Sequence, residues 1–382
     1  MTRFQRIHIG GFRRLYDVDL EMRPLMVMIG ANGVGKTSIL DVFSMLADSA
    51  AGRLNTGINE MGGITGILTN GKATKLFFDL EMEIPNYKPL KYELGIVPKG
   101  ISYSIEEEKL SQERIPKRSP FVHITSQYGD IKYYEVDENK LVHPNWEYNP
   151  LETSLSQVPK MFREPEELRR ILSSCTFYHV LNVAANAPVR LPQKMKPANL
   201  PGKDGEDLAP FLYSLREGDQ DRFESVEDTL KAAFPGFERL NFPPAAAGVL
   251  AMTWKDKDFT TPLYVHQLSE GTLRFLWLTS LLHSPSLPSV TLIDEPEVSL
   301  HPELLSHFVE LLREASQRTQ LIVATHSDRL VRFLKPEEVV VMDIDENGFA
   351  TAKWADTFDL DEWLKEYTLD EVWRLGRMGG RA

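Results

Sequence analysis

Residues 30–38 read GANGVGKTS, and this stretch decides the fold. Upstream, residues 25–29 (LMVMI) form an apolar run that predicts a buried strand, and downstream SILDVFSMLADSA carries apolar residues at helical spacing. A strand, a glycine-rich loop and a helix in this order are the context that the phosphate-binding loop motif requires. The fixed positions of G-x-x-x-x-G-K-[ST] are Gly30, Gly35, Lys36 and Thr37.

The chemistry of these residue types predicts a nucleotide site. Backbone N–H groups of a glycine-rich loop close on phosphate oxygens at the positive end of the following helix. Lys36 supplies a point charge for the β- and γ-phosphates, and Thr37 offers a hydroxyl to Mg²⁺. We therefore expect ATP and Mg²⁺ as cofactors. The nucleotide-binding residues predicted here are Gly30, Ala31, Asn32, Gly33, Val34, Gly35, Lys36, Thr37 and Ser38.

Composition limits the class of protein. The 382 residues are 42% hydrophobic and 26% charged, which fits a soluble globular chain of two or three domains, or one large domain with an insertion. The longest apolar runs are too short to cross a bilayer, and the first residues lack the apolar region of a secretion signal. We therefore expect a cytoplasmic protein with no membrane partner. Cys175 is the single cysteine, which excludes intramolecular disulfides and cysteine-rich zinc sites.

The charge pattern gives no strong sign of nucleic-acid binding. The formal net charge is −12, so attraction of the whole surface to DNA is not expected. Local basic clusters occur at Arg13–Arg14, Lys117–Arg118 and Arg169–Arg170. Taken one at a time, each is interpreted as solvated surface charge.

A second acidic motif suggests hydrolysis rather than binding alone. Residues 290–295 read VTLIDE, an apolar strand that ends in Asp294 and Glu295. A carboxylate at a strand end can hold Mg²⁺, and the next one can polarise an attacking water. The alternative is that Glu295 only opens a turn before Pro296.

Two further motifs are ambiguous when taken alone. Residues 268–272 read LSEGT at the start of a helical stretch, where Ser269, Glu270 and Gly271 could grip a phosphate or Ser269 could simply cap the helix. Residues 321–327 read LIVATHS, a strand that ends near His326. That imidazole could bond a γ-phosphate, although a lone histidine at a strand end is more often structural.

The pattern along the chain predicts an α/β fold in four parts. Residues 1–150 hold the phosphate-binding loop and, between Lys75 and Val136, alternating runs typical of an antiparallel meander. Residues 151–235 are expected to form a helical insertion. Residues 236–355 begin with short strands and alternate helix and strand from Leu268 onward, which indicates a parallel sheet with crossover helices. Residues 356–382 are expected to be a helical tail.

The order of these motifs resembles that of the ABC-type ATPases. The resemblance is strong over residues 1–45 and 265–345. It implies an ABC ATPase head with a mixed P-loop sheet, an antiparallel β lobe and the helical insertion. It also implies that Leu268–Thr272 are a signature motif, with Glu270 where transporters usually have Gly. The remaining roles it implies are Walker A for residues 30–38, metal ligands Thr37 and Asp294, catalytic residues Lys36, Glu295 and His326, and a D-loop at residues 297–301.

Motif spacing narrows the resemblance. Thr37 and Ser269 lie 232 positions apart (269 − 37 = 232), which is longer than in transporter subunits and far shorter than in SMC proteins with their coiled coils. The insertion is similar to that of RecF-like and OLD-like (overcoming lysogenization defect) ATPases, as is the opening IHIGGFRRLYDVDLEM at residues 7–22. Many such proteins act in genome maintenance or anti-phage defence.

In this class the signature acts on the nucleotide of a second chain. The resemblance therefore implies a homodimer with two composite ATP sites, possible DNA contact and a possible separate nuclease or effector. The alternatives are a regulatory scaffold that turns over little ATP and a transporter ATPase subunit. The Q-loop residue cannot be assigned; the candidates are Asn182, Asn186 and Gln193.

Residues 343–348, DIDENG, resemble a metal-binding motif but are predicted to form a hairpin turn. The twelfth position of an EF-hand is Trp354 here, where a bidentate Glu belongs. After His326 only 56 residues (382 − 326 = 56) remain, too few for a second α/β domain. We therefore expect that these 382 residues cut no nucleic acid by themselves.

Overall fold

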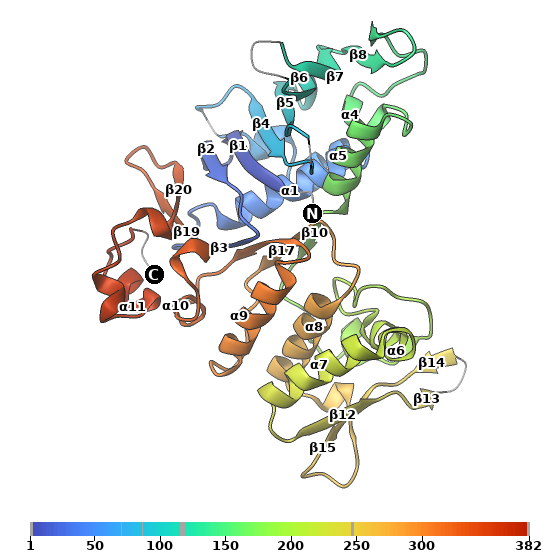
Figure 1. Cartoon of the computed structure of the whole chain (residues 1–382), viewed down its shortest axis with the longest axis vertical. Coiled ribbons are helices and arrows are strands. Elements are labelled where there is room, and N and C mark those ends of the chain that lie inside the picture. Colours follow the sequence, from blue (N-terminus) through green and yellow to red (C-terminus); the bar gives the residue numbers. More distant parts are fainter. Residues whose placement is uncertain (1–2, 70, 86, 115–118, 246–247, 380–382) are drawn as a thin grey trace.

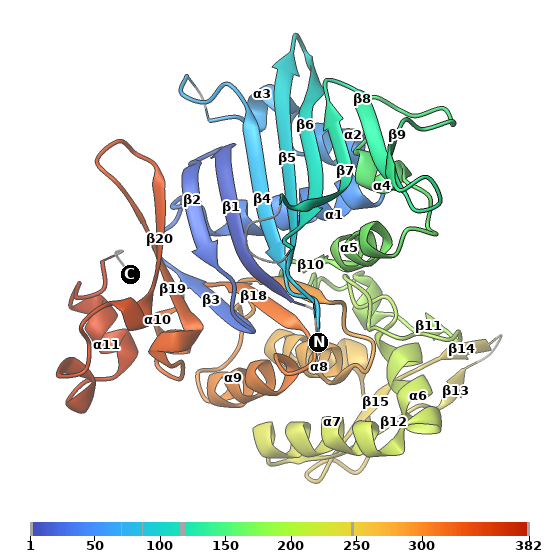
Figure 2. The same ribbon diagram turned by 45° about the horizontal axis from the view of Figure 1, so that its top comes forward.

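The computed structural model describes residues 3–69, 71–85, 87–114, 119–245 and 248–379. The Lys117–Arg118 cluster lies outside these residues. The fold is α/β, as predicted, and is built on two large sheets with a helix between them (Figures 1 and 2). No helix in the described ranges is both long and apolar enough to cross a membrane.

The central sheet is mixed and has six strands. Its first five strands run parallel, and the last pairs antiparallel with its neighbour as a hairpin. Every residue of Leu25–Ile29 is buried, because both faces of this strand are covered. The strand order is β10 (Thr176–Tyr178), β17 (Val290–Asp294), β18 (Gln320–Ala324), β3 (Leu25–Ile29), β19 (Val339–Ile344) and β20 (Ala350–Trp354).

The second sheet is the predicted meander, extended at both edges. All of its strand pairs are antiparallel, and alternate residues are buried, as the alternating sequence pattern requires. The strand order is β2 (Leu15–Glu21), β1 (Phe4–Phe12), β4 (Leu76–Met82), β5 (Leu90–Lys99), β6 (Ser102–Gln112), β7 (Phe121–Gln127), β8 (Asp130–Glu135) and β9 (Lys140–Val142).

Two hydrophobic cores lie on opposite faces of the central sheet. The first core joins both large sheets through α1 (Lys36–Ala50), which follows the phosphate-binding loop (Figure 2). The second core joins the other face of the central sheet to α8 (Glu270–His283) and α9 (Leu304–Ala315). Along β3, Met26 and Met28 face the first core, whereas Val27 and Ile29 face the second.

The segment 151–235 does not form one inserted unit. Its first helices, α4 (Ser154–Gln157) and α5 (Arg163–Ser174), pack in the first core, where α5 contacts α1. The chain then supplies β10 to the central sheet, and α6 (Leu208–Gly218) and α7 (Gln220–Ala233) pack in the second core.

The Arg169–Arg170 cluster is only half solvated. Arg169 forms an ion pair with Glu166 and donates to the carbonyl oxygen of Val158 at 2.7 Å, whereas Arg170 is exposed. The reason is that α5 presents Arg169 to the carbonyl groups at the end of α4.

The remaining elements are short. Two small sheets flank the second core, and the tail folds as helical turns whose Trp373 is buried. One small sheet contains β11 (Gln193–Lys194), β14 (Val249–Leu250) and β13 (Pro244–Ala245). The other contains β12 (Phe237–Asn241), β15 (Thr253–Asp256) and β16 (Leu263–Tyr264). The short helices are α2 (Leu54–Glu60), α3 (Ile64–Ile67), η1 (Pro188–Arg190), η3 (Val265–Gln267), α10 (Asp328–Val331), η4 (Pro336–Glu338), η5 (Ala355–Thr357), η6 (Trp363–Lys365) and α11 (Leu369–Arg374).

Candidate functional site

The loop between β3 and α1 requires glycine at two positions. Gly30 has φ 147°, and a Cβ on it would lie 2.4 Å from the carbonyl oxygen of Met342. Gly35 has φ 111° and caps α1. Because a side chain is excluded at both points, the backbone can turn tightly and present its N–H groups at the start of α1.

Lys36 lies within the curve of this loop. Its Nζ donates to the carbonyl oxygens of Gly30 at 2.6 Å and Ala31 at 3.0 Å. Burial lowers the pKa of Lys36, and the carboxylates of Glu295 and nearby residues oppose that shift. The ammonium group is therefore held where it could bind phosphate oxygens.

Asp294 ends β17 next to the loop. The Thr37 hydroxyl donates to its Oδ2 at 3.5 Å, and burial raises the pKa of Asp294, with Glu295 adding to the effect. These two oxygens suit Mg²⁺, which prefers oxygen ligands and keeps several waters. No three His, Cys, Asp or Glu side chains in the described part of the chain gather into a metal site of their own. Thr37 and Asp294 therefore fit a cation that arrives with nucleotide phosphates.

Glu295 adopts a strained backbone conformation beside Asp294. Its φ is 47°, and its N–H donates to the carbonyl oxygen of Ala324 at 2.8 Å. A left-handed conformation is uncommon for a residue other than glycine and costs about 1–3 kcal/mol. The turn places Glu295 Oε1 3.0 Å from His326 Nδ1, so the two predicted catalytic side chains are in contact.

A third carboxyl group lies behind this pair. Glu297 Oε1 accepts from the Thr325 hydroxyl at 2.5 Å, and burial raises the pKa of Glu297. The residue before His326 is thereby tied to the segment after Glu295. The two strand ends, β17 and β18, are held together by side chains as well as by their ladder.

The loop and the acidic pair share one pocket of about 310 Å³. Of the predicted loop residues, Val34 is instead part of the first core, and Ala31 packs against that core. The pocket also contains Arg13 and Arg14, which the sequence suggested were solvated surface charges. Arg13 forms an ion pair with Asp41 of α1, so that interpretation was wrong for Arg13, whereas Arg14 is exposed. The lining residues are Arg13, Arg14, Asn32, Gly33, Gly35, Lys36, Thr37, Ser38, Asp294 and Glu295.

The segment 268–272 lies apart from this pocket and lines no part of it. Ser269 caps α8 by accepting from the Thr272 N–H at 3.1 Å. A Cβ on Gly271 would lie 2.5 Å from the carbonyl oxygen of Ser299, so this turn of α8 packs directly on the segment after Glu295.

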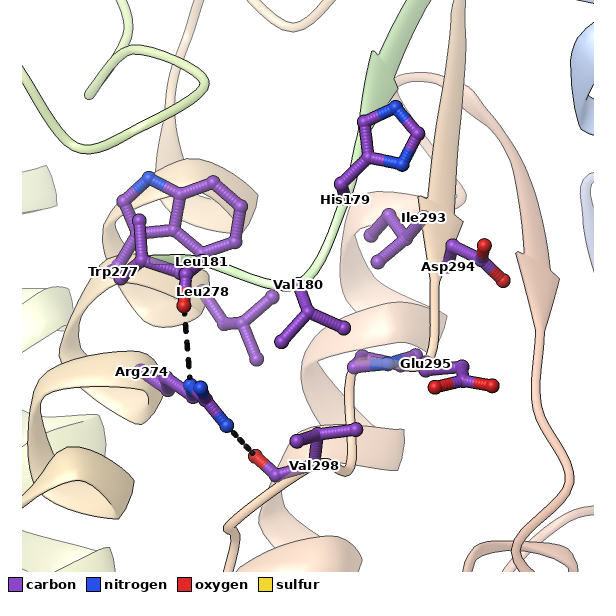
Figure 3. A pocket seen from close by; sticks show the side chains of 11 residues that line it. His179, Val180, Leu181, Arg274, Trp277, Leu278, Ile293, Asp294, Glu295 and Val298 are labelled. Carbon is purple, nitrogen blue, oxygen red and sulfur yellow. Dashed lines mark hydrogen bonds between the residues drawn. The ribbon is translucent and has the colours of Figure 1, made fainter. Parts of the chain in front are cut away.

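Arg274 connects three segments around this packing. Its guanidinium donates to the carbonyl oxygens of Leu181 at 3.3 Å and Val298 at 3.1 Å (Figure 3). It also donates to the Ser299 hydroxyl at 2.8 Å. One side chain on α8 thus joins the turn after β10 to the turn after β17.

A family comparison agrees with the geometry. The family described as "AAA domain, putative AbiEii toxin, Type IV TA system" matches residues 25–332. The chain belongs to this family. That range contains the phosphate-binding loop, the acidic strand end and His326, which meet in the structure.

Individual relatives of this AAA-family chain are distant. It is 21% identical over 360 residues to an OLD nuclease of Thermus scotoductus, an alignment that covers 88% of this chain and 63% of that protein. The chain thus spans less than two thirds of the length of that relative.

Solved structures confirm the predicted fold class. An SMC head bound to the C-winged helix domain of ScpA superposes with a TM-score of 0.51 at 13% identity, covering 93% of this chain and 99% of that one. An Smc head with an extended coiled coil, bound to the C-terminal domain of ScpA derived from Pyrococcus furiosus, gives 0.50 at 10% identity and covers 96% and 99%. The chain therefore shares its fold with SMC heads, and its sequence is distantly similar to that of an OLD nuclease.

None of the three Q-loop candidates lies at the pocket of this AAA-family member. Asn182 accepts from the Ala184 N–H in a turn, Asn186 is exposed, and Gln193 is buried among backbone groups of the second core. The residue that follows β10 beside Asp294 is His179. Sequence reasoning missed it, although the stretch CTFYHVLNV indicated a strand ending near this histidine.

Proposed function

We propose that this chain binds ATP with Mg²⁺ and hydrolyses it in a clamp made of two copies. The observation that carries the proposal is that three strand ends come together: the loop and Asp294–Glu295 line one pocket, and His326 contacts Glu295. The loop after β3, Asp294–Glu295 after β17 and His326 after β18 come from three segments far apart in the sequence.

In the proposed mechanism the loop N–H groups and Lys36 hold the phosphates. Mg²⁺, held by Thr37 and Asp294, would supply charge stabilisation to the transferred phosphoryl group. Glu295 accepts a proton from the attacking water, and its contact with His326 fixes the direction of the carboxylate. The other ring nitrogen of His326, Nε2, is left to hydrogen-bond the γ-phosphate.

The dimer follows from the position of the signature. Ser269 and Glu270 are exposed at the N-terminus of α8, outside the pocket of their own chain. A helix N-terminus favours an anion, so the α8 end of one chain can close on the γ-phosphate held by another. ATP would then act as a bridge between two chains, and hydrolysis would release them.

For the biological role we propose DNA maintenance or anti-phage defence with a separate effector chain. The support is the similarity to an OLD nuclease, which is longer than the aligned region, and the shared fold with SMC heads that were solved bound to ScpA. In this proposal the 382 residues supply the ATP-driven clamp, and the effector supplies any cleavage of nucleic acid.

The assembly is tested by multi-angle light scattering with ATP and Mg²⁺. Glu295→Gln should be a stable dimer with ATP and a monomer without it, because the bridge forms and is not removed. Lys36→Ala, which lacks the phosphate-binding charge, is the matched control and should stay monomeric. A Glu295→Gln chain that binds ATP in calorimetry but remains monomeric contradicts the clamp.

A further inference from the structure

A histidine lies beside the carboxylate that the proposed function assigns to the metal. Strand β10 pairs in parallel with β17, with Tyr178 opposite Ile293. One residue further along each chain, His179 comes opposite Asp294. Figure 3 shows the His179 ring and the Asp294 carboxylate on the same side of the small pocket that both residues line.

The alternation of the two strands explains why they share a side. Phe177 and its partner Leu292 belong to the core that contains α1, whereas Tyr178 and Ile293 belong to the core on the other face. Side chains alternate along a strand, so His179, which follows Tyr178, and Asp294, which follows Ile293, return to the face that α1 covers. The phosphate-binding loop lies on that same face.

The His179 imidazole lies at the surface, held by a ring contact. The ring packs on Phe177, with centroids 3.9 Å apart, and the residue is exposed. Burial and Glu295 raise the pKa of Asp294 and His179 opposes them, which puts the imidazole within electrostatic reach of the carboxylate.

We propose that His179 is a nitrogen ligand for the divalent cation that Thr37 and Asp294 hold with ATP, and that it favours Mn²⁺ over Mg²⁺ at this site. The proposal rests on the proposed function, because the cation enters with the nucleotide. A neutral imidazole suits transition metals, whereas Mg²⁺ prefers hydroxyl, carboxylate, phosphate and water oxygens. A site with one nitrogen among its oxygens therefore discriminates between two ions of equal charge.

The other histidine near the pocket provides a matched control. His326 already contacts Glu295 through Nδ1 at 3.0 Å, and it follows β18 rather than β10. In the proposed mechanism His326 orients Glu295, which acts on the attacking water, and does not contact the metal ligands Thr37 and Asp294. His179→Gln and His326→Gln therefore remove the same chemical group from two sides of one pocket.

The test uses pulsed electron paramagnetic resonance on the full chain with Mn²⁺ and a non-hydrolysable ATP analogue. Wild type and His326→Gln should show ¹⁴N coupling from a directly bound imidazole, and His179→Gln should lose it. In parallel, competition of Mg²⁺ against Mn²⁺ should show that His179→Gln reduces the preference for Mn²⁺ by on the order of 10-fold, the effect typical of tuning around a metal site.

The outcomes separate this proposal from the one on which it rests. Tight binding of the Mn²⁺–nucleotide complex without ¹⁴N coupling, or coupling lost in His326→Gln and kept in His179→Gln, overturns the role of His179 and leaves the ATPase proposal standing. Failure of wild type to bind the nucleotide complex in calorimetry overturns both. An unchanged thermal unfolding curve for His179→Gln shows that loss of coupling is not loss of fold.

Discussion

Two pairs of carboxylates follow strands of the central sheet, and only one pair enters the pocket. Asp294 ends β17 and Glu295 follows it, whereas Asp343 lies near the end of β19 and Asp345 follows that strand. The two strands run in the same direction, separated by β18 and β3. The sequence pattern around each pair is similar: an apolar strand that ends in acidic residues.

The difference lies in what binds the carboxylate oxygens. Asp345 Oδ1 accepts from the N–H groups of Asn347 at 2.9 Å and Phe349 at 2.8 Å, so it holds the β19–β20 hairpin turn predicted from the sequence. These backbone bonds, that to Phe349 above all, lower the pKa of the half-buried Asp345. By contrast, burial raises the pKa of Asp294, which accepts a hydrogen bond from the Thr37 hydroxyl.

The comparison teaches that an acidic strand end becomes a candidate site when the backbone does not use its oxygens. After β19 the chain turns back at once, and the turn satisfies itself with Asp345. After β17 the strained turn at Glu295 leaves the carboxylates facing the phosphate-binding loop. Strain at one acidic end and a relaxed turn at the other are visible in the backbone angles.

The largest expected effect belongs to Glu295. Glu295→Gln should keep ATP binding and lower turnover by on the order of 10²–10⁴, because a positioned general base contributes that much. Phosphate release at saturating ATP measures the rate, and calorimetry measures binding. If turnover stays within a few-fold of wild type, Glu295 is not the general base. The functional contrast between the Asp294–Glu295 pair and the Asp343 and Asp345 pair is then lost.

A smaller effect is expected at Asp294. Asp294→Asn keeps the shape and removes the charge that would hold Mg²⁺, so the Mg²⁺ concentration for half-maximal turnover should rise on the order of 10–100-fold. Titration of turnover with Mg²⁺ at fixed ATP checks this. An unchanged Mg²⁺ dependence would mean that Asp294 serves the fold, as Asp345 does.

The smallest effect is expected at Asp345. Asp345→Asn should leave turnover unchanged and reduce stability slightly, because it removes the charge that the turn N–H groups favour. The folded pKa of Asp345 is lowered, so its contribution is complete above the unfolded pKa of about 3.9. That contribution is lost as the pH falls through the folded pKa. Melting curves from pH 2 to pH 7 should therefore converge for the two chains at the acidic end, and a stability difference that persists there contradicts the assignment.

Local features of the fold and site could be predicted from the sequence. The β3–loop–α1 unit, the meander and the β19–β20 hairpin depend on neighbouring residues, and their patterns were sufficient. The position of His179 depends on β10 pairing with β17, more than a hundred residues away, and no local pattern records that register. Arg13 was missed for the same reason, since its place at the pocket depends on Asp41 across two elements.

The most direct test of the composite site mixes two defective chains. Ser269→Arg damages the exposed α8 end and keeps the phosphate-binding loop, whereas Lys36→Ala damages the loop and keeps the α8 end. A mixed dimer should contain one site with both intact parts, so the mixture should hydrolyse ATP although neither chain does so alone. If mixed dimers are shown to form by differently tagged chains and no turnover returns, the two halves do not act across the chains.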